Sequence, residues 1–179
     1  QLQKIATKEA IETEDEALHL IAQKADGAMR DALSLFDLIV TFSHGQKVTY
    51  QSTIDNLHIL DYDYYFRMAD SLYAEDTAKV LLIFDEILKK GFDGHNFIVG
   101  LNSHFRDLMV CKDAATIELL QVSDSIKVKY KEQSESVSLS FLLSALNIAS
   151  QCDINYKASK NQRLHIELAL IKMAHISSA

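Results

Sequence analysis

The chain of 179 residues contains no proline and only five glycines. The tight turns of β-hairpins usually need these two residue types, so a chain with so few of them is predicted to be helical throughout. Apolar residues make up 48% of the chain, which is enough to bury a hydrophobic core. We therefore expect an all-α protein with one or two domains.

Residues 1–45 are predicted to form a small bundle of three short helices. Thr13 and Glu16 match the capping box that starts a helix, and this helix ends near Asp26–Gly27. The next helix carries an apolar stripe of Met29, Leu33, Phe36, Leu38 and Val40. Gly45 ends the unit. A bundle of this length is small for independent stability, so we expect packing against a neighbouring domain to stabilise it.

Residues 46–179 are predicted to form a second, larger helical domain. Polar residues typical of helix starts precede its apolar stretches, at Thr49, Asp61, Asp76, Asp93, Ser138 and Asn161. The last helix, from Asn161 to about Ile176, is apolar over most of its circumference. A helix of this kind is buried on several sides, so we place it at the domain centre or at a subunit interface.

Charge and cysteine content narrow the functional classes. The formal net charge of −7 disfavours a free-standing binder of duplex DNA, because such binding depends on neutralising phosphates. Cys111 and Cys152 are not closely spaced, as expected for reduced residues of a cytoplasmic protein. No apolar run approaches the roughly 20 residues that span a bilayer, so no membrane partner is expected. The chain begins without methionine, in a segment that is predicted to be helical, so we expect it to be a fragment of a longer protein.

The stretch ADGAMRDALSLFDLIV, residues 25–40, places an arginine at the start of a helix. A cation is unfavourable there, because a helix N-terminus already carries partial positive charge. In one interpretation Arg30 forms a surface ion pair with Asp26 or Asp31, worth at most about 1 kcal/mol. In the other, its planar guanidinium faces the terminal phosphate of a nucleotide bound by another domain.

This stretch resembles the sensor-2 segment of bacterial DNA polymerase III gamma/tau subunits, the ATPase subunits of the sliding-clamp loader. The matching residues are Gly27, Arg30, Asp31, Ala32, Leu33, Ser34, Leu35 and Asp37. The glutamine usual after that last aspartate is Leu38 here. The resemblance is strongest over residues 14–40, and the rest of the chain is similar in length and helix count to the family's collar domain.

The resemblance implies that residues 1–45 are an AAA+ lid and residues 46–179 a helical collar and oligomerisation domain. It assigns nucleotide binding to Arg30, supported by Gly27 and Asp31. ATP with Mg would be bound mainly by an N-terminal domain absent from this sequence, which has no phosphate-binding loop and no cysteine cluster. We therefore expect no catalytic residue, no metal site and no ATP hydrolysis by this segment alone, although the intact subunit it resembles is an ATPase of the DNA polymerase III holoenzyme.

The implied partners are other clamp-loader subunits through the collar, and the sliding clamp and primed DNA through the intact complex. Two alternatives stay open. The chain is a non-catalytic helical adaptor between proteins, or it is the lid and collar of another AAA+ clamp-loader subunit.

Other residues with functional chemistry have simpler explanations. His104 and Cys111 can share a helix face, but zinc sites need more ligands at closer spacing, so both are expected to be core or surface residues. A nucleic acid or an acidic partner can bind alternating lysines, but a solvated face is the favoured explanation for Lys127, Lys129 and Lys131. Core and interface packing, rather than base stacking, is expected of Tyr62, Tyr64, Tyr65 and Phe66.

Overall fold

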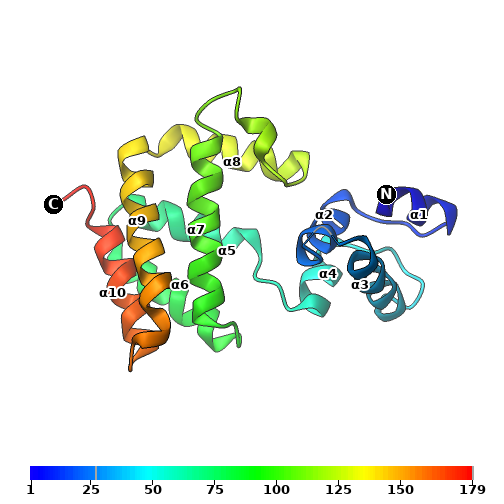
Figure 1. The fold of residues 1–179 in the computed structure, drawn as a ribbon, viewed down its shortest axis with the longest axis horizontal. Coiled ribbons are helices and arrows are strands. Elements are labelled where there is room, and N and C mark those ends of the chain that lie inside the picture. Colours follow the sequence, from blue (N-terminus) through cyan, green and yellow to red (C-terminus); the bar gives the residue numbers. More distant parts are fainter. Residues whose placement is uncertain (27, 179) are drawn as a thin grey trace. The chain divides into compact units, whose positions relative to one another are not determined.

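The computed structural model describes residues 1–26 and 28–178. Over these residues it contains ten α-helices, two short 3-10 helices and no β-strand, which confirms the all-α prediction (Figure 1). The chain divides into two compact units. Unit 1 consists of residues 1–59 and 121–127, and unit 2 consists of residues 60–120 and the residues from Val128 onward.

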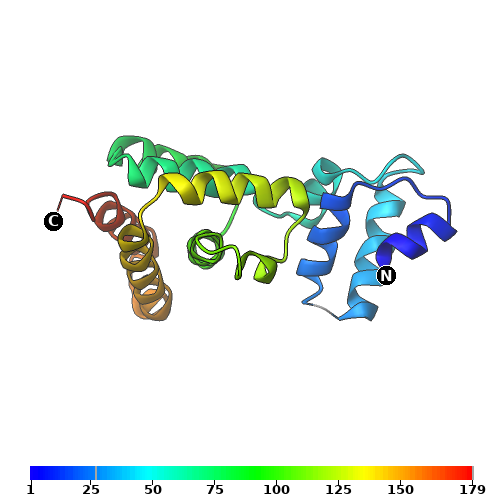
Figure 2. The same ribbon diagram turned by 90° about the horizontal axis from the view of Figure 1, so that it is seen from above.

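Unit 1 contains helices α1 (Leu2–Lys8), α2 (Asp15–Lys24), α3 (Met29–Phe42) and α4 (Tyr50–Leu57). Helices α2 and α3 lie side by side, and α4 packs against both (Figure 2). Their apolar faces bury a common core that includes Ala6, Ala17, Ile21, Phe36, Ile39 and Val48. The three helices predicted for residues 1–45 are therefore present.

The predicted capping box of Thr13 and Glu16 is wrong. Helix α2 begins at Asp15, and no side chain caps it. Thr13 instead lies in an extended segment beside Val48, whose N–H donates to the carbonyl of Glu12 at 2.9 Å. The Thr13 hydroxyl is buried there without a hydrogen-bond partner among the described residues. Backbone pairing with a distant residue holds Thr13 away from the helix end that its side chain would have capped.

Unit 2 is built from the remaining helices. They are α5 (Tyr62–Tyr73), α6 (Thr77–Lys89), α7 (Gly94–Val110), α8 (Asp124–Ser136) from Val128 onward, α9 (Leu139–Asn155) and α10 (Gln162–Ala174), with 3-10 helices at Ile117–Leu119 and Tyr156–Ala158. Helices α7 and α9 pack along each other, and Figure 2 shows α7 almost end-on. The core of unit 2 therefore lies between these two helices and α5, α6 and α10, which pack around them.

The predicted helix starts are confirmed by side-chain caps. In each case the side chain of the N-cap residue accepts a hydrogen bond from a backbone N–H in the first turn. The residues are Thr49, Asp61, Asp76, Asp93, Ser138 and Asn161. Each cap satisfies a donor that the helix itself leaves free, so these boundaries are set by local sequence.

The last helix, α10, packs against α5, α6, α7 and α9, as expected of a helix at the centre of the domain. Its buried residues include Ile166, Leu170 and Met173. Leu164 and Leu168 are 46% and 47% exposed, so one apolar face of α10 stays uncovered. The helix is therefore buried over part of its circumference only.

Candidate functional site

Among the residues that the structure describes, no side chain caps the N-terminus of α3. Its N-cap residue is Ala28, whose N–H donates to the carbonyl of Ala25 at 2.9 Å. Asp26 adopts a left-handed conformation with φ of 49°, which ends α2 and turns the chain toward α3. The predicted site residue Gly27 lies outside the described residues. The turn at Asp26 thus lies shortly before Arg30 in the sequence.

Arg30 occupies the second position of α3, and its side chain is exposed. It forms no ion pair with Asp26, Asp31 or any other described residue, so the surface ion-pair interpretation does not hold. Asp31, the other predicted site residue in the described part, is also exposed in the first turn. The guanidinium is therefore available to a group from outside these residues.

The opposite face of α3 fixes the helix in the core. Ala32, Phe36 and Ile39 are buried, with Phe36 and Ile39 fully inaccessible to solvent. Side chains on buried faces of packed helices hold the backbone in place, so Arg30 extends from a rigid support.

The electrostatics of the α3 start favour an anion. The first N–H groups of a helix carry a combined partial positive charge, and Ala28 supplies no side-chain oxygen to neutralise it. Arg30 adds a full positive charge in the same turn, which also carries the exposed carboxylate of Asp31. A phosphate group matches both features, because helix N-termini and arginine are each common phosphate-binding elements. The arrangement can hold an anion.

The other residues with functional chemistry have structural roles. His104 is buried in unit 2, and its Nδ1 and Nε2 atoms contact the Tyr130 hydroxyl at 3.0 Å and the Gln133 side-chain oxygen at 2.8 Å. Burial raises the pKa of the Cys111 thiol. Among the described residues, no group of three or more His, Cys, Asp or Glu side chains is placed to hold a metal ion.

The lysines and aromatic residues also match the simpler expectations. Lys129 and Lys131 are exposed, and Lys127 lies 3.9 Å from the Asp124 carboxylate. Phe66 contacts the buried His104 edge-on, with 4.7 Å between ring centroids. The aromatic group therefore packs in the core of unit 2 rather than forming an exposed stacking surface.

Sequence reasoning missed two contacts that join α2 to residues near position 123. The Gln23 side chain donates to the carbonyl of Gln121 at 2.6 Å, and the Ser125 hydroxyl donates to the Glu16 carboxylate at 2.5 Å. The partners lie 98 and 109 residues apart in the sequence, and nothing in the local pattern of either segment marks them. Only an alignment of related sequences could have revealed such a pairing.

No single helix among the described residues is both long and apolar enough to cross a membrane. The bent pair formed by Asp124–Ser136 and Leu139–Ala158 meets the length and composition requirement only when the two are taken together.

Comparison with known families covers almost the whole chain. Residues 1–45 match the model of the DNA polymerase III clamp loader subunit ATPase lid domain. Residues 48–179 match the model of domain III of the DNA polymerase III gamma and tau subunits.

Individual relatives agree with these matches. The tau subunit of DNA polymerase III from Bacillus subtilis is 27% identical over 177 residues, which are 99% of this chain and 31% of the relative. The tau subunit from Escherichia coli is 31% identical over 99 residues, which are 55% of this chain and 15% of that protein. The chain therefore spans less than a third of either relative.

The structural comparison supports the same fold. A solved structure of the Bacillus subtilis DNA clamp loader delta protein has a TM-score of 0.56 and 18% identity, covering 96% of this chain and 53% of that one. At this identity the likeness shows the fold alone. Because a family model matches residues 48–179 and whole-chain relatives agree with it, the chain belongs to the DNA polymerase III gamma and tau subunit family.

Proposed function

We propose that this chain supplies the lid and the collar of a clamp-loader ATPase subunit, with the lid in residues 1–45 and the collar in residues 46–179. In this proposal ATP and Mg are bound by an ATPase domain that precedes the lid. Arg30 contacts the terminal phosphate of the ATP, with Gly27 and Asp31 shaping the helix start. The subunit acts in the cytoplasm.

The observation that carries this proposal is the exposed guanidinium of Arg30, which forms no ion pair with another described residue, at a helix start that no described side chain caps. A cation at a helix start is unfavourable by about 0.3–1 kcal/mol where no anion accompanies it, and the exposed Asp31 carboxylate in the same turn offsets only part of this cost. The terminal phosphate of ATP is such an anion, and hydrolysis removes it. The described residues fit the phosphate group of the nucleotide. They do not account for binding of Mg, because they contain no cluster of ligands for a metal ion.

A contact of this kind can switch the subunit between two conformations. A ligand shifts an equilibrium only by the difference in its affinity for the two states. Arg30 would contact the terminal phosphate only when lid and ATPase domain are close together. A charge-assisted hydrogen bond contributes about 1.5–3 kcal/mol, which corresponds to a population shift of roughly ten- to a hundredfold. ATP would therefore set the position of the lid.

The test is the Arg30→Ala substitution in the full-length subunit. We expect the affinity for a non-hydrolysable ATP analogue to fall about tenfold or more, and ATP-dependent clamp loading to fall with it. Lys24→Ala is the matched control, because Lys24 is an exposed cation in the last turn of the neighbouring helix α2. If Arg30→Ala loads clamps as well as the parent, Arg30 has no role in nucleotide sensing and the adaptor alternative gains support.

The collar function is supported by exposed apolar residues on the last two long helices. They are Leu139, Leu143 and Ile154 on α9, and Leu164 and Leu168 on α10, each at least 46% exposed. Apolar surface gathered on neighbouring elements is typical of protein interfaces. We propose that this face, the α9–α10 face, binds other clamp-loader subunits, and that the assembled complex contacts the sliding clamp and primed DNA.

Charge substitution tests the α9–α10 face. Leu143→Asp combined with Leu168→Asp is expected to weaken subunit assembly at least tenfold, because each substitution places an unpaired charge in an apolar interface. Sedimentation of the purified subunits, mixed and alone, measures the effect. Leu82→Asp on α6 is the control, since Leu82 is 69% exposed and lies outside this face. Unchanged assembly in the double variant would assign the interface to another surface.

A further inference from the structure

Residues 121–127 belong to unit 1, although they follow 61 residues of unit 2 in the sequence. We name this segment the strap. Two side chains of α2 bind it: Gln23 donates to the Gln121 carbonyl at 2.6 Å, and Glu16 accepts from the Ser125 hydroxyl at 2.5 Å. Glu16 and Gln23 are seven residues apart and therefore lie on one face of α2. That face of the lid holds the strap at two points.

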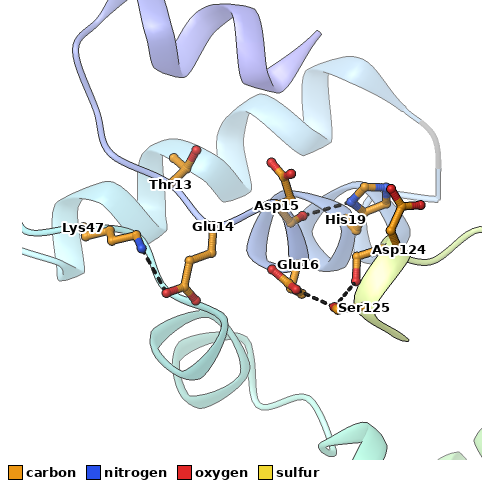
Figure 3. A pocket seen from close by; sticks show the side chains of 9 residues that line it. Thr13, Glu14, Asp15, Glu16, His19, Lys47, Asp124 and Ser125 are labelled. Carbon is orange, nitrogen blue, oxygen red and sulfur yellow. Dashed lines mark hydrogen bonds and ion pairs between the residues drawn. The ribbon is translucent and has the colours of Figure 1, made fainter. Parts of the chain in front are cut away.

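The strap is anchored by buried side chains as well. Val122, Ser123 and Ile126 are 5%, 5% and 8% exposed. The Ser123 and Ser125 hydroxyl groups are 3.0 Å apart. Figure 3 shows Ser125 beside Glu16. Donation by Ser125 is the main cause that lowers the pKa of Glu16, so the carboxylate is charged and the bond is charge-assisted at neutral pH.

Open space surrounds the two polar contacts. A cavity of about 400 Å³ lies between the start of α2, Lys47 and residues 123–125 (Figure 3). A second hollow of about 640 Å³ is lined by His19, Ala22, Gln23, Asp26 and Gln121. The two polar contacts therefore adjoin open space, whereas Val122 and Ile126 of the strap are buried. Polar contacts beside open space break locally more readily than contacts in a packed core.

The strap is well placed to follow movements of Arg30. Helix α2 leads through the short turn at Asp26 into α3, so Gln23 lies only seven residues before Arg30. The strap runs without a break into residues 128–136 of α8. Within unit 2 those residues are held by the buried contacts of Tyr130 and Gln133 with His104. A strap that stays on α2 therefore connects the lid to a helix fixed in the collar.

We propose that residues 121–127 are a docking strap for the lid, held by Glu16 and Gln23, and that the strap transmits nucleotide-driven movement of the lid into α8. This inference rests on the proposed role of Arg30. The chain connects the two units between residues 59 and 60 and again on both sides of the strap, and the strap contacts with α2 would make the connection at residues 127 and 128 a route for that movement. The binding surface is the α2 face, and its occupant is this segment of the same chain.

Hydrogen exchange of the full-length subunit tests whether the strap is held as proposed. Without nucleotide, combining Gln23→Ala with Ser125→Ala is expected to speed exchange at the strap amides roughly tenfold, because two net-stabilising hydrogen bonds are lost. Gln51→Ala is the matched control, since Gln51 makes a similar exposed bond to Asp55 within α4. Thermal unfolding shows that each variant is folded. Unchanged strap exchange in the double variant would overturn the proposal.

Addition of a non-hydrolysable ATP analogue tests transmission. We expect exchange at residues 128–136 to change severalfold in the parent, and that change to be lost in the double variant while analogue affinity stays the same. If Arg30→Ala weakens analogue binding but residues 128–136 of the parent do not respond, transmission by the strap is wrong and the proposed function stands. If Arg30→Ala has no effect, the proposed function fails, and the exchange without nucleotide still decides whether the strap is docked.

Discussion

The Nδ1 atom of His104 lies 3.0 Å from the hydroxyl oxygen of Tyr130, inside the core of unit 2. The Gln133 side-chain nitrogen donates to the Phe66 carbonyl and to the Asp70 carboxylate, so its oxygen faces His104 Nε2. Nε2 must then carry the hydrogen, and Nδ1 accepts from Tyr130. This network requires a neutral imidazole and joins α5, α7 and α8.

Stability should therefore depend on pH below neutrality. Burial lowers the pKa of His104 from 6.5 to about 4. Above pH 6.5 His104 is neutral in both states, whereas between pH 6.5 and 4 only the unfolded chain binds the proton. The free energy of unfolding should thus fall as pH falls through this window, by about 3 kcal/mol in total. Denaturant unfolding at each pH measures the effect.

Substitution at His104 identifies the residue responsible. His104→Gln should be less stable at pH 7 by about 1–3 kcal/mol, because it leaves buried groups unpaired, and its stability should vary less between pH 6.5 and 4.5. His44→Asn serves as control, since His44 is exposed and asparagine tolerates its left-handed backbone. An equal pH dependence in His104→Gln would assign the effect to other groups.

Gly100 in the middle of α7 should resist substitution. A Cβ at this position would lie 2.1 Å from the Tyr65 hydroxyl oxygen and 2.5 Å from its ring. Alanine improves helix propensity by about 1 kcal/mol, but overpacking costs typically 1–3 kcal/mol and this clash is severe. We expect Gly100→Ala to lower the free energy of unfolding by about 2 kcal/mol. Adding Tyr65→Ala should make the Gly100 substitution nearly neutral or favourable, and an additive double variant would contradict this explanation.

The C-terminal ends of α1 and α6 have the same pattern of backbone hydrogen bonds, but different residue types occupy the left-handed position after each helix. Gly91 after α6 has φ of 84°, and Ala10 after α1 has φ of 54°. The left-handed region suits glycine and strains alanine by about 1 kcal/mol. Ala10→Gly should therefore raise stability by about 0.5 kcal/mol and Gly91→Ala lower it by about 1 kcal/mol in thermal unfolding. Ala22→Gly, inside α2, is the control and should destabilise, so a loss of stability in Ala10→Gly would sink the prediction.

Arg30 should matter for nucleotide response and not for folding. The side chain is exposed and forms no ion pair within the described part of the chain, so Arg30→Ala and Arg30→Lys should change the free energy of unfolding by less than about 0.5 kcal/mol. Lysine keeps the charge but loses the planar pair of donors, so Arg30→Lys should recover only part of the response to an ATP analogue. Calorimetric titration of the full-length subunit measures that response. A large loss of stability in either variant would instead indicate a structural role.

The sequence alone determined the helical class and most helix starts. Asp76 and Asp93 cap helices whose first turns lie within three residues of them, so the bond that defines each start is local and visible in the sequence. The residues around Arg30 that resemble the sensor-2 segment likewise lie close together in the sequence, within one turn and one helix. Because the chain contains no proline, the spacing of apolar residues was the main evidence for helices, and it was sufficient to predict the helical class.

Only the tertiary structure decided the features that join distant segments. Thr13 fits a capping box by itself, yet pairing with Val48 takes it out of reach of the helix. Glu16 and Ser125 carry no local pattern that predicts their hydrogen bond. In the sequence, Gly100 is only a residue that weakens a helix. In the structure, Tyr65 packs against it and leaves no room for a Cβ atom. In each case the conformation of the residue depends on an interaction with a partner far along the chain. The spacing of nearby residues does not reveal that partner, so local sequence patterns cannot predict the interaction.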